Sequence, residues 1–501
     1  MKPHFLTLLP RTAISALAKN FPKVANFWKV GLQFRDILLK NAQNRGGVFF
    51  KFSKAKIATP CIMGLIMLST LMSCKNNTPN NTATTDNEKS IITYRQAAEF
   101  EPTEAVWLMW SNYDHKEGYS NHKTQVEIIR ALLLYTKVTL IVPNDSTINS
   151  IMAGNVAFER KLGQSLSILA KTAVENGRLS FFKADYREFW TRDIGPAFLV
   201  GSDGKLAIAD FSFSGWGYGK TTDADVVKDE KLDEKIAEKW GIKTVSTPLI
   251  TEGGDHEVNG KGTLIVCEAV ELTRNPTMSL AQIEAEFKRV LGVKKVIWLK
   301  KGSYEDDYTF SGRLKNKAGD SLYTVLTTNG HVDETARFVN DSTILLAQPV
   351  DLDDPIDQEN KRRMDVNFDI LKRATDQDGR PFKIVRMPLP KLMFTTLKPN
   401  DGVYEVIKDF KYKDGSTFPT GKPVKIVTAS SYLNFLIAND VVLMAKYGEQ
   451  STDIVVKKRD EAAERVLKSV FPNKKIIGIN AYAINLGGGG IHCITRNEPK
   501  L

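Results

Sequence analysis

The strongest constraint on the fold is a regular alternation of amphipathic helical segments with short β-branched or aromatic runs. Each helical segment precedes its strand, and the successive pairs are 125–135 and 138–142, 166–174 and 179–183, 231–240 and 244–248, 280–291 and 296–299, 362–374 and 382–387, and 461–470 and 475–479. The pairs share this pattern without residue-level identity. The alternation predicts one mixed α/β fold rather than separate domains.

The basic net charge of the chain belongs to its N-terminal segment. The sequence has 501 residues and a formal charge of +11, from 69 Lys and Arg against 58 Asp and Glu. Residues 1–74 hold 11 of the basic residues and one acidic residue, Asp36, which leaves 58 basic and 57 acidic residues for the rest. A nucleic-acid-binding protein would carry its basic excess on the folded body. We therefore exclude nucleic acid as a partner.

Residues 1–74 have the features of an export signal with an extension in front of it. Three lysines precede an apolar run at 57–72, which is short for a membrane span and typical of a signal peptide. The run ends in Leu-Met-Ser-Cys, which resembles the lipobox of bacterial lipoproteins, so we expect lipidation at Cys74. A membrane-anchor helix or a short core helix is the alternative. Residues 1–50 exceed an ordinary signal peptide, which a start codon assigned too far upstream would explain.

These features divide the chain into three parts. We predict an N-terminal extension with a lipoprotein-type signal at 1–74, a polar tether at 75–92 and a single folded domain at 93–501. The expected location is the periplasm or the cell surface, with the membrane as a partner through the lipid anchor. If the signal is not used, the protein is expected in the cytoplasm.

Four consecutive glycines come just before a cysteine near the end of the sequence, where residues 486–493 read LGGGGIHC. A glycine run is costly in backbone entropy, so it indicates close approach of the main chain or backbone angles forbidden to other residues. Cys493 therefore faces a ligand or, as the alternative, is a structural thiol beside a flexible loop. Cys267 lies in an apolar run and is expected to be inert core, and no Cys/His cluster suggests a metal.

Four polar segments follow predicted strands, at residues 186–196, 252–255, 329–334 and 430–434. Loops at strand ends often carry catalytic groups on a rigid scaffold, so we expect these segments and the glycine run to converge. Within the third segment, a histidine and an aspartate two residues apart would face one pocket if the chain were extended. A surface turn is the alternative for this pair.

Six motifs occur in this order: WTRDIGP, EGGDHEVNG, ELTRNPTMSLAQIEAEFKRVLGVKKVIWLKKG, NGHVDETARF, SYLNF and LGGGGIHCIT. Together they resemble the agmatine deiminase and bacterial peptidylarginine deiminase family of the pentein superfamily, over residues 94–499. The resemblance implies that the domain at 93–501 is catalytic and folds as a five-bladed, pseudo-symmetric α/β propeller with the site at its centre. It also implies that no metal or organic cofactor is needed.

The resemblance assigns the chemistry to four residues. Asp193 and Asp333 would clamp a planar guanidinium with paired hydrogen bonds, unless they form structural salt bridges with neighbouring arginines. Cys493 would attack the guanidinium carbon to give a covalent thiouronium. His331 would protonate the departing ammonia and then activate the water that hydrolyses the adduct.

A further set of residues is predicted to bind the substrate: Trp190, Glu252, Asn434, Glu334, Gly489 and Gly490. The alternative for Trp190 is a core position, and for Asn434 a structural turn. Glu252 would contact the substrate or buttress Arg192. His492 should point away from the thiol in an extended segment, so it receives no role.

The sequence departs from the family pattern at two places. Residues 494–499 read ITRNEP, where two glutamines are expected before the proline. Glu334 replaces the usual asparagine, and its carboxylate suits a substrate with an amine at its far end, such as agmatine. The predicted lipid anchor instead favours extracellular peptides.

The favoured reaction is agmatine plus water to N-carbamoylputrescine plus ammonia. Deimination of peptidyl arginine to citrulline is the first alternative, followed by deimination of free arginine. Amidino transfer to an acceptor amine and a non-catalytic guanidine-binding lipoprotein are the others. The sequence leaves the oligomeric state open.

Overall fold

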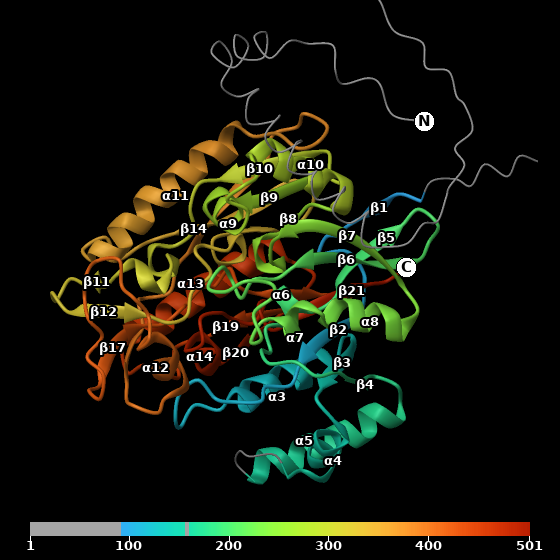
Figure 1. Cartoon of the computed structure of the whole chain (residues 1–501), viewed down its shortest axis with the longest axis horizontal. Helices are drawn as coiled ribbons and strands as arrows, with labels where there is room; N and C mark the ends of the chain where they lie inside the picture. Colours follow the sequence, from blue (N-terminus) through green and yellow to red (C-terminus); the bar gives the residue numbers. More distant parts are fainter. Residues whose placement is uncertain (1–91, 156–159) are drawn as a thin grey trace, which may run out of the picture. The chain divides into compact units, whose positions relative to one another are not determined.

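The computed structural model describes residues 92–155 and 160–501, drawn as a coloured ribbon in Figure 1. The predicted signal, the lipidation site at Cys74 and nearly all of the tether lie outside the described residues. Within the described part, no helix is both long and apolar enough to cross a membrane.

Five sheets of residues 92–155 and 160–501 share one three-strand pattern. A short first strand runs antiparallel to the second strand, and a helical crossover leads to a third strand parallel to the second. The sets are β21 (Arg496–Pro499), β2 (Thr103–Met109) and β3 (Lys137–Val142); β5 (Ala197–Gly201), β6 (Leu206–Ser212) and β7 (Lys243–Ile250); β8 (Glu257–Val258), β9 (Thr263–Cys267) and β10 (Lys295–Leu299); β13 (Ala336–Phe338), β14 (Thr343–Gln348) and β15 (Lys383–Pro388); and β18 (Leu436–Ala438), β19 (Val441–Ala445) and β20 (Lys475–Ile479). These five units are the blades of the predicted α/β propeller, which is confirmed.

One main helix crosses over within each blade. In blade order these are α3 (Asn121–Leu132), α8 (Leu232–Trp240), α10 (Leu280–Leu291), α11 (Pro355–Arg373) and α13 (Ile454–Val470). In Figure 1, α11 lies along the upper left edge of the coloured ribbon, while β19, β20 and β21 lie nearer its middle. All six predicted helix–strand pairs are present, the sixth being α5 (Arg160–Glu175) with β4 (Leu179–Lys183), which extends the first blade.

The remaining elements connect or extend the blades. The helical ones are α4 (Asp145–Ala153), α6 (Thr191–Ile194), α7 (Val227–Glu230), α9 (Glu268–Arg274), α12 (Gly402–Ile407), α14 (Tyr482–Asn485) and the 3-10 turns η1 (Gly253–Asp255), η2 (Tyr304–Asp306), η3 (Thr309–Ser311) and η4 (Val332–Glu334). β1 (Tyr94–Arg95) pairs with β5. A further sheet is formed by β11 (Leu314–Lys315), β12 (Ser321–Thr324), β17 (Val424–Val427) and β16 (Phe394–Leu397), and it joins segments that precede two different blades.

Local sequence signals begin and end the crossover helices. Ser279 and Gln282 form a capping box at the start of α10, and Gly292 ends this helix in the left-handed conformation at φ 65°. Asp354 begins α11 by accepting a hydrogen bond from the backbone N–H of Ile356, with a proline at the first helical position. Such signals explain why the helical segments could be predicted from the sequence.

The first blade closes the ring because its strands come from distant parts of the chain. β21 pairs antiparallel with β2, and Arg496 lies opposite Trp107. The Trp107 indole Nε1 donates a hydrogen bond of 2.8 Å to Glu498. Cys493, three residues before β21, is therefore positioned by this closure.

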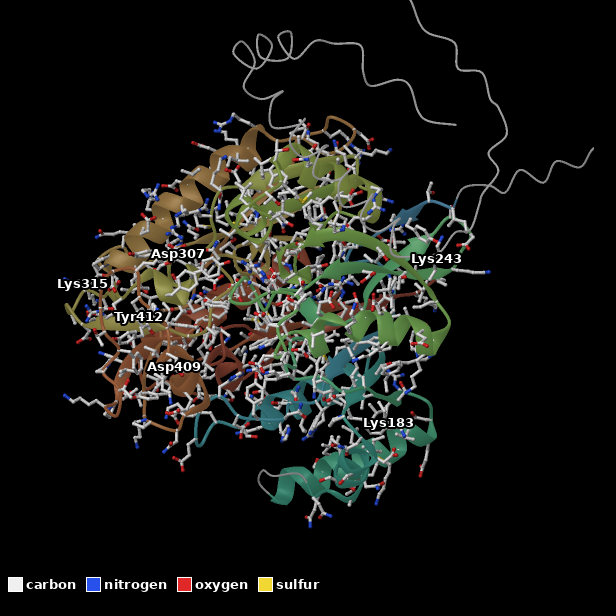
Figure 2. All side chains as sticks on the ribbon, viewed as in Figure 1. Lys183, Lys243, Asp307, Lys315, Asp409 and Tyr412 are labelled. Carbon is white, nitrogen blue, oxygen red and sulfur yellow. The ribbon has the colours of Figure 1, made fainter. Side chains whose placement is uncertain are left out.

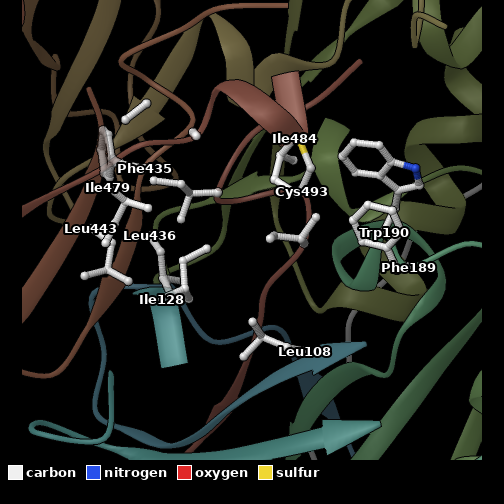
Figure 3. Close-up of a cluster of buried hydrophobic side chains, with 14 of the residues drawn as sticks. Leu108, Ile128, Phe189, Trp190, Phe435, Leu436, Leu443, Ile479, Ile484 and Cys493 are labelled. Atoms are coloured by element: carbon white, nitrogen blue, oxygen red, sulfur yellow. The ribbon is translucent and has the colours of Figure 1, made fainter. Parts of the chain in front are cut away.

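Apolar side chains of the first and last blades pack together beside the glycine run. Figure 3 shows Leu108 of β2, Leu436 of β18 and Leu443 of β19 in one cluster that also contains Trp190 and Cys493. Many charged side chains lie at the surface, as the exposed Lys183, Lys243 and Lys315 do in Figure 2. The rigid apolar packing therefore reaches up to the predicted nucleophile.

A buried arginine joins three blades. The Arg337 side chain in β13 is fully buried, its Nε donates to Glu257 of β8, and its Nη1 donates to the carbonyl oxygens of Leu433 (2.9 Å) and Phe435 (2.6 Å) next to β18. Its Nη2 lies 3.1 Å from an oxygen of Glu99. A charge withdrawn from water in this way is stable only while its partners are in place.

We expect Arg337→Gln to lower the free energy of unfolding by about 3–5 kcal/mol, because the carboxylates of two neighbours lose their buried counter-charge. The measurement is urea unfolding followed by circular dichroism. Arg289→Gln is the matched control, since that side chain is 48% exposed and pairs with Glu286 at the surface; it should cost less than about 1 kcal/mol. Equal losses in the two variants would contradict the assigned role of Arg337.

Candidate active site

Five connections place the predicted residues together, and each leads into the first strand of a blade. Asp193 in α6 precedes β5, Glu252 precedes η1 and β8, His331 and Asp333 lie at η4 before β13, Asn434 precedes β18, and Cys493 precedes β21. Equivalent positions in a pseudo-symmetric ring face the same centre. Residues three hundred positions apart in the sequence are thereby brought into one site.

The Cys493 thiol lies between an amide and two carboxylates. The Asn434 Nδ2 donates to the sulfur at 3.1 Å, one oxygen of Asp333 lies 3.7 Å from it, and one oxygen of Glu334 lies 3.9 Å from it. Asn434 also accepts a 2.9 Å hydrogen bond from the backbone N–H of His492. The predicted place of Asn434 next to the cysteine is therefore found in the structure.

The surroundings keep the resting thiol protonated. Burial, followed by the negative charges of Asp333, Glu334 and Asp193, raises the pKa of Cys493 well above its ordinary value. Burial and the neighbouring charge of Asp333 likewise raise the pKa of Glu334 well above its usual range. A cation placed among these groups would reverse the effect on the thiol, because it stabilises the thiolate.

Asp193 is fixed by hydrogen bonds rather than by an arginine. Its two oxygens accept from the backbone N–H of Gly254 at 2.9 Å and from the Trp216 indole N–H at 2.8 Å. The alternative of a salt bridge with Arg192 is wrong, since that guanidinium pairs with Glu99 at 3.0 Å. The sequence analysis did not predict a role for Trp216. Its backbone has a φ of 55°, a conformation that is rare for a bulky residue. The two glycines beside it are its only signal in the sequence.

His331 is held by Glu252. The imidazole Nε2 lies 3.1 Å from a Glu252 oxygen, and Glu252 pairs with Arg274 at 2.8 Å. Glu252 therefore supports the histidine. The predicted role in which Glu252 buttresses Arg192 is wrong. Burial opposes protonation of the imidazole, but the charges of Asp193 and Glu252 outweigh it and raise the pKa of His331 to about 9.

The histidine beside the nucleophile takes part in the site. Residues 491–494 form a turn, so the extended backbone on which the prediction for His492 depended is wrong. Its Nδ1 lies 2.6 Å from Asp333 and its Nε2 lies 2.6 Å from Glu99. His492 thus orients the Asp333 carboxylate, whose pKa is lowered by the His492 hydrogen bond despite the opposing effect of burial.

The glycine run permits close packing around the thiol. A Cβ atom on Gly489 would lie 3.0 Å from the Cys493 sulfur and 2.6 Å from the Trp190 ring, and one on Gly490 would lie 2.5 Å from the Asn434 side-chain oxygen. A cavity with an empty volume of about 280 Å³ adjoins this region, and Trp190, Asp193 and Cys493 line it. Trp190 is 5% exposed, so it is both a core residue and a wall of the cavity.

The loop that follows β12 of the extra sheet supplies another wall of this cavity. Residues 326–328 line the cavity, and none of them is acidic.

Two buried atoms of the site, Nδ1 of His331 and Oδ1 of Asp333, have no hydrogen-bond partner among the described residues. Buried polar atoms normally have hydrogen-bond partners, so these two atoms are available to a bound ligand.

Asp333, Glu334 and Cys493 also offer ligand atoms within 4.8 Å of one another, a spacing that would admit a metal ion. Thiolate and carboxylate ligands suit different classes of metal, so this set favours none strongly. That catalysis needs no metal stays a prediction.

The sequence matches a known protein family over most of its length. Residues 95–312 and 318–499 match the family described as Porphyromonas-type peptidyl-arginine deiminase. The chain belongs to this family. The predicted membership is thereby confirmed.

Relatives of this family member are similar over most of their length. The agmatine deiminase of Medicago truncatula is 28% identical over 428 residues, which cover 83% of this chain and 99% of that protein. The agmatine deiminase of Stutzerimonas stutzeri is 32% identical over 337 residues, 66% of this chain and 80% of that protein. The solved structure of the Enterococcus faecalis agmatine deiminase superposes with a TM-score of 0.60 at 26% identity, over 81% of this chain and 96% of that one.

The high pKa of His331 can be measured directly. In protein labelled with ¹³C at the histidine ring, we expect one resonance, absent in His331→Asn, to titrate near pH 9. Glu252→Gln removes a negative neighbour that favours the imidazolium, so this pKa should fall by about one unit. Glu286→Gln, at the surface, is the control and should leave it unchanged. An unaltered titration in folded Glu252→Gln protein would refute the assigned cause.

Proposed function

We propose that this protein hydrolyses the guanidino group of agmatine to give N-carbamoylputrescine and ammonia through a covalent adduct on Cys493. The observation that carries the proposal is a buried thiol beside the carboxylates of Asp333 and Glu334, in a cavity also lined by Asp193. Such a thiol is not activated by its own surroundings. A guanidinium supplies both the missing positive charge and the electrophilic carbon.

Binding of the substrate also activates the Cys493 thiol. The carboxylates of Asp193 and Asp333 accept the guanidinium N–H groups, and the unpartnered Oδ1 of Asp333 is free to do so. The bound cation lowers the pKa of Cys493, and the thiol proton is lost to solvent. The thiolate then adds to the guanidinium carbon.

His331 carries the proton transfers that follow. In its imidazolium form it protonates the departing nitrogen, so that ammonia leaves and an S-alkylthiouronium remains on Cys493. The neutral imidazole then takes a proton from a water molecule as the hydroxyl adds to the same carbon. Collapse of this adduct expels the sulfur, which takes up the hydroxyl proton, so that the neutral ureido product and the Cys493 thiol remain, with His331 protonated again.

The names of similar proteins support agmatine over the other guanidino compounds. Those of Medicago truncatula and Stutzerimonas stutzeri are named agmatine deiminases. Glu334 adds nothing to this choice, because its carboxyl lies 3.9 Å from the Cys493 sulfur, where the guanidinium binds, and not at the far end of the substrate. The family description names peptidyl arginine, which makes an arginine peptide the necessary competitor in the test.

The deciding assay measures ammonia and ureido product from full-length protein with agmatine, free arginine and an arginine-containing peptide. We expect turnover of agmatine with kcat/KM at least about tenfold above that for the others, since a lost ionic contact in a binding site costs on the order of 1–3 kcal/mol. A preference for the peptide would show that the substrate is protein-bound arginine and not agmatine. No ammonia from any of them would refute deimination.

Variants then test the roles. Cys493→Ala should reduce turnover by on the order of 10⁴-fold or more while retaining guanidinium binding, because only the nucleophile is lost. Asp333→Asn should weaken binding as well, since half of the clamp loses its charge. Cys267→Ala is the matched control, because that thiol is buried core, and it should retain turnover. Loss of folding in both Cys493→Ala and Asp333→Asn would count against these roles.

We also propose that the chain is exported and anchored through a lipid on Cys74, a proposal supported by the sequence of residues 57–74 alone. Expression in a bacterial host with radiolabelled palmitate should label the protein in the membrane fraction. Cys74→Ser should abolish the label, while Cys61→Ser should not. A soluble, unlabelled wild-type protein would refute the anchor.

A further inference from the structure

A second cavity, partly open to solvent, lies between the β1–β2 connection and strands β8 and β21. Glu99, Arg192, His256, His492, Arg496 and Asn497 are among the residues that line it. The substrate cavity shares none of these six side chains. The proposed hydrolysis gives this second space no task.

Arg496 is a buried cation that forms no salt bridge with any described residue. The residue is 3% exposed, and its Nη1 donates at 3.1 Å to the backbone carbonyl of Arg192. No carboxylate oxygen of the described residues lies within 4.0 Å of its nitrogens. It stands in the segment where the family pattern led us to expect glutamine.

The carboxylates that face this cavity are already paired with other cations. Glu99 pairs with Arg192 at 3.0 Å, with Arg337 at 3.1 Å and with His492 at 2.6 Å. The other two are Glu101, which pairs with Arg95, and Glu257, which pairs with Arg337. Among the described residues, Arg496 is therefore the arginine of this cavity that no carboxylate pairs with.

Burial and the like charge of Arg192 lower the pKa of Arg496 to about 9 against the opposing charges of Asp193 and Glu99, so the guanidinium remains protonated at neutral pH. His256 adds no charge, because burial lowers its pKa to about 3. A buried charge is costly unless a counter-charge accompanies it. The unpaired guanidinium and the adjoining space together call for an anion.

We propose that Arg496, beside Arg192, binds a small monovalent anion of the chloride or formate type in this cavity. Arg192 links this site to the segment that carries the nucleophile. The backbone N–H of Arg192 donates at 2.9 Å to the carbonyl of Cys493, and its Nε donates at 3.3 Å to the carbonyl of His492. Occupancy would hold the turn that carries Cys493 against the segment that carries Asp193.

The packing around Arg496 is specific to its guanidinium. A Cβ atom on Gly253 would lie 2.2 Å from Arg496 Nη1 and 2.2 Å from the carbonyl oxygen of Arg192, so only glycine leaves room for the pair. Arg496 also lines another cavity, which is bordered by Asp193, Asp229, Glu230 and Asp233 and is unsuited to an anion. The anion is therefore assigned to the cavity that Glu99 and His492 line.

The test uses full-length protein transferred from sodium gluconate to sodium chloride at constant ionic strength. We expect chloride to raise the midpoint of thermal unfolding by about 2–5 °C, as ligand binding to the folded state requires. Arg496→Gln should abolish this difference, while Arg289→Gln, which alters a surface arginine, should keep it. Sodium formate in place of chloride separates a carboxylate ligand from a halide.

Crystals of the wild-type protein soaked in sodium bromide give a readout that does not depend on any variant. We expect an anomalous peak within about 3–4 Å of the Arg496 guanidinium, the contact range of a charge-assisted hydrogen bond to a halide. Bromide confined to surface sites, or equal chloride sensitivity in folded Arg496→Gln, would overturn the proposal. Because both readouts are independent of turnover, they stand apart from the proposed deimination.

Discussion

One buried carboxylate, that of Glu99, organises the positive charges on which the site is built. It bridges Arg192, Arg337 and His492, which belong to three different blades. These cations hold the pKa of Glu99 well below its usual range even though burial opposes ionisation. The position of the nucleophile, through the backbone contact of Arg192 with Cys493, and the orientation of Asp333, through His492, both follow from this single anion. Each pair is worth little unless the whole network is satisfied.

The same principle, applied with the opposite sign, defines the substrate cavity. Around the thiol the structure gathers carboxylates in excess, so the resting cysteine is a poor nucleophile. Only a cation of the right shape completes the charge balance there. Selectivity and reactivity are thus one property of the site, since a neutral compound that entered the cavity would find a protonated thiol.

The sequence predicts the local elements well because their signals are local. The caps of α10 and α11 and the alternation of helix and strand are visible in the printed residues. The fivefold repetition is not visible, because first strands such as β8 have two residues. The partners of Glu99 lie 93 and 393 positions away, at Arg192 and His492, so no neighbouring residue identifies it as a network centre. For His492 the cue was present beside Cys493, but the assumed extended backbone was wrong.

The pairing of β21 with β2 ties catalytic competence to the order in which the protein folds. These strands are among the most widely separated partners of the chain, as the hydrogen bond between Trp107 and Glu498, 391 positions apart, shows. Contacts of such long range carry a large loop-closure cost and form late. An intermediate with four assembled blades would hold Asp193 and His331 in place yet lack the thiol. Completion of the ring is therefore the same event as the appearance of the nucleophile, and partly folded molecules are chemically inert.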